Sequence, residues 1–239
     1  MSLCFLVRRQ IAAAICFLLV GGVFVAPLSA QSVLGEIETL VFDDVVAPGN
    51  PDVTGIEIGP WLIASQKFHT VSLSDAGLLR LPNNGTPYIA SVGGGLDYPI
   101  TLERFDGSPF ALVGFDAAEG FLDDLLAAEQ GFTSATKIEV EAALTTGFTV
   151  TLEFDLDGRR DGPDGVDDFE SFTMPTELHS VTSITFTGLS GALRDAGFAL
   201  DNLVVAAVVP EPASGTLLAV AGGFLCVVAA ARYQARVRG

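Results

Sequence analysis

Residues Lys137–Ala142 read KIEVEA, and residues Phe148–Phe154 read FTVTLEF. In both segments apolar and polar side chains alternate one by one. An extended chain places alternate side chains on opposite faces, so the apolar ones share one face. The pattern predicts two β-strands, with Ile138 and Val140 directed toward a core.

The same pattern recurs along much of the chain. Asn84-Gly85 is a strong tight-turn signal, and Gly93–Gly95 marks another connection. The other expected strands are Glu38–Phe42, Trp61–Ala64, Lys67–Leu73, Leu79–Leu81, Tyr88–Ala90, Ile100–Phe105, Phe110–Phe115, Ser183–Thr187 and Phe198–Val205. Many short strands at spacings near ten residues predict an all-β antiparallel sandwich or barrel. One segment differs, because Ala117–Gln130 has leucines at helical spacing and predicts a short helix closed by Gly131.

The C-terminal end has a separate organisation. Val209-Pro210-Glu211-Pro212-Ala213-Ser214 leads into an uncharged apolar run, Gly215–Ala231, and then into three arginines, Arg232, Arg236 and Arg238. The run is just long enough to cross a bilayer, which takes about 17–25 residues. Arginines collect on the cytoplasmic side, so we expect the terminus inside and the preceding domain outside. The alternative is a buried core helix, but that would show a polar stripe.

The N-terminal end also predicts export. Arg8 and Arg9 precede an apolar stretch, Ile11–Val25, which is followed by Pro27-Leu28-Ser29-Ala30. This order is typical of a secretory signal peptide. We expect residues 1–30 to be removed by cleavage after Ala30; an uncleaved N-terminal anchor is the alternative.

Together, the Pro-Glu-Pro spacer, the apolar run and the arginine cluster resemble the PEP-CTERM sorting signal of Gram-negative bacteria. The resemblance covers residues 209–239, with Val209, Pro210, Glu211, Pro212 and Ala213 as the sorting and processing motif. It implies recognition by an exosortase after passage through the export machinery. It further implies a transient inner-membrane intermediate, followed by anchoring or release at the cell surface.

The remaining segment, residues 31–208, has the length of one domain. Its composition is acidic: 28 of the chain's 29 Asp and Glu residues lie there with seven Lys and Arg, a formal net charge of −21. This excludes nucleic acid, whose phosphates need cationic partners, and favours divalent cations or neutral partners. Adaptation to a salty habitat explains the acidity equally well. All three cysteines, Cys4, Cys16 and Cys226, lie outside the domain, so we expect no disulfide within it.

Three short motifs resemble the jelly-roll domains often joined to such tails. They are Phe42-Asp43-Asp44, Gly114-Phe115 and the closing Phe198–Leu203 (FALDNL). The resemblance implies a galactose-binding-like or lectin-like sandwich with a central last strand. Asp201 and Asn202 would then lie near a strand end, where they hold a loop or a cation.

The segment Asp155–Asp168 alternates carboxylates with glycines, a composition suited to calcium, which takes six to eight oxygen ligands. The candidate ligands are Asp155, Asp157, Asp161, Asp164 and Asp168. Arg159 stands where an EF-hand loop needs an oxygen, so a looser calcium-stabilised loop is predicted. A solvated acidic turn is the alternative, since Asp and Gly are favoured in turns.

Catalytic signals are weak. His69 and His179 have no neighbouring His or Cys in sequence, and Ser190 lacks a nucleophile elbow. Trp61, beside Pro60, is the candidate for an exposed ligand platform. The leading hypothesis is therefore an exported, non-enzymatic surface or matrix protein that binds extracellular polysaccharide. The alternatives are a secreted polysaccharide hydrolase that uses a carboxylate pair, and a calcium-stabilised structural surface protein.

Overall fold

The alternating segments form strands, and the prediction of an all-β antiparallel fold is confirmed. A computed structural model describes residues 33–43, 52–72, 81–82, 85–91, 98–120, 133–158, 169–191 and 196–209. Within these residues the strands are β1 Val33–Leu40, β2 Asp52–Ile58, β3 Trp61–Val71, β4 Tyr88–Ser91, β5 Ile100–Arg104, β6 Phe110–Glu119, β7 Lys137–Leu144, β8 Thr149–Asp155, β9 Glu170–Thr173, β10 Val181–Leu189 and β11 Phe198–Val209, with a short 3-10 helix η1, Thr176–Leu178.

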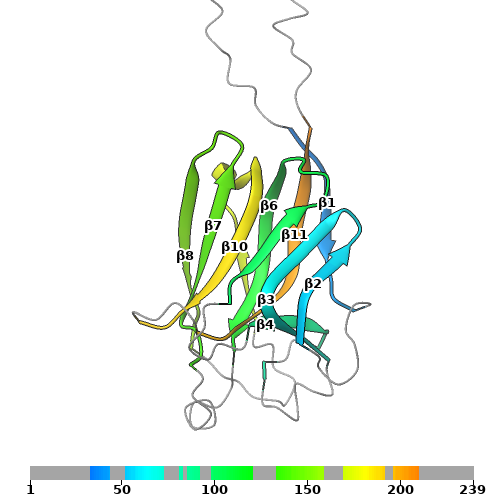
Figure 1. The fold of residues 1–239 in the computed structure, drawn as a ribbon. Coiled ribbons are helices and arrows are strands. Elements are labelled where there is room, and N and C mark those ends of the chain that lie inside the picture. The colour runs from blue at the N-terminus through cyan, green and yellow to red at the C-terminus, as the bar shows by residue number, and fades with distance from the viewer. Residues whose placement is uncertain are drawn as a thin grey trace, which may run out of the picture. The chain divides into compact units, whose positions relative to one another are not determined.

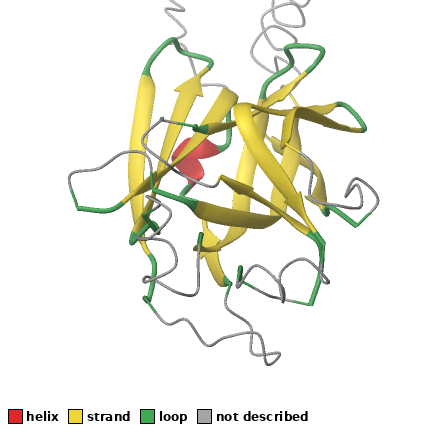
Figure 2. Cartoon of the chain, turned by 60° about the horizontal axis from the view of Figure 1, so that its bottom comes forward, coloured by secondary structure: helices red, strands yellow, loops and turns green. Residues whose placement is uncertain are grey.

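The strands form one antiparallel sheet that curls back on itself (Figures 1 and 2). Its order is β8-β7-β10-β5-β3-β4-β11-β6-β9, with β1 added on β11 and β2 on β3. A further bridge joins Val181 of β10 to Phe110 of β6. This bridge closes a ring through β10, β5, β3, β4, β11 and β6, so the sandwich is nearly a barrel. The last strand, β11, lies centrally and pairs with β1, β4 and β6.

The two ends of the sandwich differ. At one end β1 begins and β11 finishes, with Val33 opposite Val209. Tight turns join β5 to β6 and β7 to β8 at this same end. Phe110, the first residue of β6, pairs with Ala207 near the end of β11, and Val181 of β10 pairs with both Phe110 and Leu144, the last residue of β7. We call this the terminal end, at the top of Figure 1. At the opposite end, the loop end, β6 and β8 finish and β9 begins.

The core fills the space that the curled sheet encloses. Trp61, Phe110, Phe115, Phe186 and Phe198 are almost fully buried in one continuous cluster. Trp61 packs edge-on to Phe110 at 5.1 Å between ring centroids. A smaller cluster around Tyr88, Phe169 and Val71 lies apart from it. Burial of apolar surface therefore holds the sandwich, without a disulfide among the described residues.

The structure corrects the predicted helix. Ala117, Ala118 and Glu119 are the last residues of β6, where Ala117 pairs with Leu200 on one side and Glu170 on the other. Both faces of β6 are buried here, so the alternation that marks a half-exposed strand is missing. Residues 121–130 lie outside the described residues. Two short strands, β2 and β9, were also not predicted, and the two segments expected within residues 61–73 form one continuous strand, β3.

The export signals fall almost wholly outside the described residues. These signals are segment 1–30, the motif from Pro210 to Ala213, the apolar run 215–231 and the arginines Arg232, Arg236 and Arg238. Val209 is described as the last residue of β11. In the described part of the chain, no helix has the length and apolar character needed to span a bilayer.

Candidate metal centre

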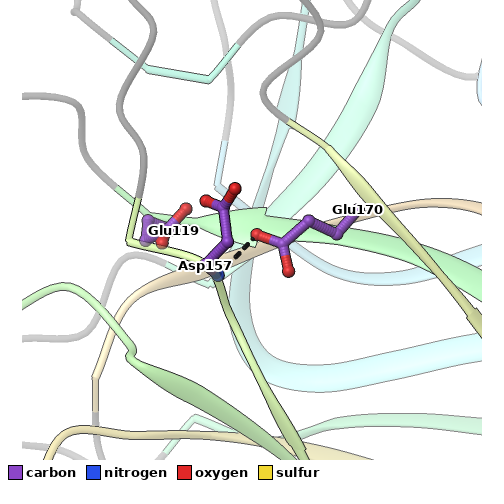
Figure 3. Close-up of side chains that lie close together, drawn as sticks. All are labelled: Glu119, Asp157 and Glu170. Atoms are coloured by element: carbon purple, nitrogen blue, oxygen red, sulfur yellow. Dashed lines mark hydrogen bonds between the residues drawn. The ribbon is translucent and has the colours of Figure 1, made fainter.

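Three carboxylates from different parts of the chain converge at the loop end. Glu119 is the last residue of β6, Asp157 follows β8, and Glu170 is the first residue of β9. One carboxylate oxygen from each lies within 4.8 Å of the others (Figure 3). Asp157 and Glu170 flank the acidic segment 159–168 in sequence, so the cluster stands where that segment leaves and rejoins the sandwich.

Backbone amides fix two of these carboxylates. The amide of Asp157 donates to Oε1 of Glu170 at 2.8 Å, and the amide of Gly158 donates to Oε1 of Glu119 at 2.8 Å. Gly158 has a φ of 71°, in the left-handed region that glycine enters without a steric penalty. The sharp turn after β8 therefore directs both amides at the cluster.

The cluster is also partly withdrawn from water. Glu119 is 2% exposed, whereas Asp157 is exposed and Glu170 is half-buried. Burial raises the pKa of Glu170 to about 6; the hydrogen bond from the Asp157 amide opposes the shift, and the charges of Glu119 and Asp157 add to it. Close carboxylates in a poorly solvated position repel one another unless a proton or a cation neutralises them.

The donor set fits a hard divalent cation. All three ligands are carboxylate oxygens, which suit calcium or magnesium, whereas structural zinc sites use Cys and His. Calcium oxygens lie about 2.3–2.6 Å from the ion. Two oxygens on opposite sides of one ion are therefore about 4.8 Å apart, which the observed spacing allows. Calcium accepts irregular coordination and bidentate carboxylates, so three acidic side chains with water or further loop oxygens suffice.

The predicted ligands do not all meet in this cluster. Asp157 is part of it. Asp155 instead pairs with Lys137, at 3.1 Å from Oδ1 to Nζ, and its side chain is largely exposed. Asp161, Asp164 and Asp168 lie outside the described residues. Sequence reasoning missed Glu119, which it assigned to a helix, and Glu170, which stands two residues beyond the acidic segment as it was delimited.

Trp61 is not a ligand platform, and that prediction is wrong. It is 1% exposed and belongs to the core. Its indole N–H donates to Oε2 of Glu38 at 3.1 Å, and the Arg104 guanidinium lies 5.2 Å from the ring centroid. Trp61 begins β3 directly opposite Arg104, whose side chain covers the ring, while Pro60 occupies the exposed turn.

Asp201 and Asn202 form a second polar group, inside β11 and not near its end as predicted. Asn202 has a φ of 47°, and the register with β6 shifts between Asp201 and Val204, which marks a β-bulge. Asp201 is buried and accepts hydrogen bonds from Thr86 Oγ1 at 2.7 Å and from the Asn202 amide at 2.8 Å. Nδ2 of Asn202 donates to Asp116 on β6 at 2.7 Å. The expected contact of Asp201 with a loop is therefore present, through Thr86.

No protein-family model matches this sequence, and the search of curated proteins finds no match. Among solved structures the chain is similar to CBM32-3 from a family 31 glycoside hydrolase of Clostridium perfringens, with 13% identity, 52% of this chain and 77% of that chain covered, and a TM-score of 0.31. It is similar to CtCBM11, with 16% identity, coverages of 76% and 99%, and a TM-score of 0.27.

The chain is also similar to the CBM22-1–GH10 modules of xylanase Xyn10B from Clostridium thermocellum. The identity is 11% and the TM-score 0.31, over 66% of this chain and 29% of the xylanase. Similarities this low transfer no residue role to this chain, so the chemistry of the cluster follows from its own geometry.

The half-buried Glu170 predicts a pH dependence in the absence of divalent cations. Its pKa in the folded protein is about 6, above its usual 4.5, so the folded state holds the proton more tightly than the unfolded chain. Stability then falls as the pH rises from about 4.5 to about 6, and the loss persists above that range. Glu170→Gln cannot ionise, yet its amide oxygen can still accept the Asp157 amide.

In EDTA we expect Glu170→Gln to melt at a higher temperature than wild type above pH 6, with the difference vanishing below pH 4.5. Thermal unfolding of both proteins between pH 4 and pH 8 measures this. A melting-temperature difference that does not change with pH would contradict the assignment.

Proposed function

We propose that this chain is an exported, non-enzymatic β-sandwich of the bacterial cell surface or extracellular matrix, stabilised by calcium at the loop end. The observation that carries the calcium part is the convergence of Glu119, Asp157 and Glu170. Calcium neutralises their mutual repulsion and fastens both ends of the acidic segment 159–168 to the sandwich. Metal binding that favours the folded state adds directly to folding stability.

The sorting part of the proposal is supported by the sequence alone. An exosortase recognises the motif Val209–Ala213. The apolar run 215–231 lies transiently in the inner membrane, and the arginines after it stop export of the chain. Residues 1–30 supply entry into the export pathway. Surface fractionation of cells that express the full chain tests this, and an exclusively cytoplasmic protein would contradict it.

Extracellular polysaccharide is the partner that we propose for the loop end. Calcium held by three carboxylates keeps coordination positions that sugar hydroxyl oxygens can fill, because the ion takes six to eight oxygens. The acidic surface opposes polyanions and tolerates neutral glycans. A glycan array probed with and without EDTA tests the partner, and binding is expected only with calcium.

Isothermal titration with calcium distinguishes the cluster from general acidity. Asp157→Asn removes a ligand charge and is expected to weaken calcium binding at least tenfold, because affinity follows the number of charged ligands. Asp155→Asn is the matched control: the same change two residues away, at a carboxylate that pairs with Lys137. We expect wild-type affinity for the control. Equal losses of calcium affinity in both variants would show that calcium binding depends only on the overall negative charge of the protein.

A hydrolase on the same carboxylates is the second candidate. It is favoured by Glu170, a half-buried carboxylic acid with a raised pKa beside two further carboxylates, which is the environment of a general acid. This alternative requires turnover of a polysaccharide that Glu170→Gln abolishes without unfolding the protein. Turnover would replace the structural role of the cluster by a catalytic one.

A further inference from the structure

The terminal end of the sandwich carries exposed aromatic side chains at its turns. Among the described residues the exposed large hydrophobic side chains include Phe105 at 51%, Phe148 at 74% and Val209 at 49%. Phe105 lies in the turn between β5 and β6, closed by the Gly107 amide donating to the Arg104 carbonyl at 3.0 Å. Phe148 directly follows the turn between β7 and β8, closed by the Gly147 amide and the Leu144 carbonyl at 2.9 Å. Both turns hold these rings outside the core.

The register places both turns near the exit of the chain. Leu144 pairs with Val181, Val181 with Phe110, and Phe110 with Ala207, two residues before Val209. Paired strands lie about 4.7–5.5 Å apart, so both turns and Val209 belong to one compact surface. Glu119, Asp157 and Glu170 lie at the opposite end.

The length of chain after Val209 limits how far this surface can stand from a membrane. Only five residues, Pro210–Ser214, separate β11 from the apolar run Gly215–Ala231. Six consecutive steps of fully extended chain reach at most about 20–22 Å. When the run lies in a bilayer, the terminal end must therefore lie close to the lipid surface.

We propose that the turns bearing Phe105 and Phe148 contact the lipid bilayer while residues 215–231 occupy it, so that the carboxylate cluster faces away from the membrane. This inference rests on the proposed sorting function, because the apolar run supplies the tether. Aromatic side chains gain free energy at the membrane interface by burying their rings among lipid. The Arg104 guanidinium neutralises Asp106 at 2.8 Å, but Glu57 beside the β2–β3 turn and Glu177 in η1 leave this end acidic, so neutral lipid is the expected surface.

Fluorescence quenching in vesicles tests the contact. The full chain with Phe148→Trp is reconstituted in phosphatidylcholine vesicles with acyl chains brominated near the headgroup, and in unbrominated vesicles. The wild-type chain, whose single tryptophan is the 1% exposed Trp61, is measured in parallel, and its emission is subtracted from that of the variant. We expect brominated lipid to remove much of the emission of Trp introduced at position 148 and little of the emission of Trp61. Phe105→Trp should respond likewise.

The matched control is Thr151→Trp, an exposed position on β8 three residues beyond Phe148 in the direction of the loop end. We expect its emission to be unaffected by bromination. Flotation of the vesicles separates the membrane tether from the lipid contact of the turns. A chain that does not float with lipid overturns both. A chain that floats, but whose fluorescence at positions 105 and 148 is quenched no more than at position 151, overturns the lipid contact alone.

Discussion

Replacing Phe115 by alanine is expected to lower the free energy of unfolding by about 3–5 kcal/mol. Phe115 is 1% exposed, and its ring packs on three others: Phe154 at 5.6 Å, Phe172 at 5.2 Å and Phe186 at 5.2 Å between centroids. These rings come from β8, β9 and β10. The alanine variant leaves a cavity where four strands meet, and rigid strands cannot collapse to fill it.

Phe148→Ala is the matched control, because Phe148 is the same residue type at 74% exposure. Its loss should change the free energy of unfolding by less than about 0.5 kcal/mol. Urea unfolding of the two variants and the wild type measures both values. Similar losses for Phe115→Ala and Phe148→Ala would contradict the described core.

Phe115 also matters for the cluster. Phe154 and Phe172 belong to β8 and β9, the strands from which Asp157 and Glu170 extend, and they contact each other at 5.2 Å. The pairing of the four-residue strand β9 with β6 places Glu170 opposite Ala117, near Glu119, and the packing of Phe172 on Phe115 and Phe154 supports this position. The cavity variant should therefore weaken calcium binding as well as stability.

The clean alternation in residues 137–142 and 148–154 predicted β7 and β8 because each of these strands has a core face and a more exposed face. In β8 half-buried and exposed positions alternate along its length. The same rule fails for the end of β6, where burial on both faces removes the alternation and the leucines that follow suggest a helix. It also fails for β9, because Glu170-Ser171-Phe172-Thr173 offers a single large apolar residue.

The acidic segment pointed to the correct end of the sandwich but to few of the residues that converge there. Asp157 was predicted because carboxylates and glycines crowd around it in sequence. Glu119 lies 38 residues earlier and reaches the cluster only because β6 lies between β11 and β9, which no local pattern reveals. Trp61 shows the converse: a lone tryptophan beside a proline suggests exposure, but its register with Arg104 buries it.

Glu119→Gln is expected to abolish the rise in melting temperature that calcium produces, with a loss of about 2–5 kcal/mol in binding free energy. Glu119 is the most buried of the three carboxylates, so water cannot replace its charge around a bound ion. Glutamine keeps the shape, and its amide oxygen can still accept the Gly158 amide that Glu119 binds at 2.8 Å. The folded structure should therefore survive while the ligand charge is lost.

Glu141→Gln removes the same charge from an exposed position on β7, outside the cluster, and serves as the control. Melting curves of wild type and both variants, in EDTA and in millimolar calcium, measure the effect. In EDTA we expect Glu119→Gln to equal or exceed the wild type, because one buried charge no longer repels Asp157 and Glu170. In calcium the order should reverse, since only wild type and Glu141→Gln gain stability. If both variants gain as much from calcium as wild type does, the cluster is not the calcium site, because no buried ligand would then be needed for the gain.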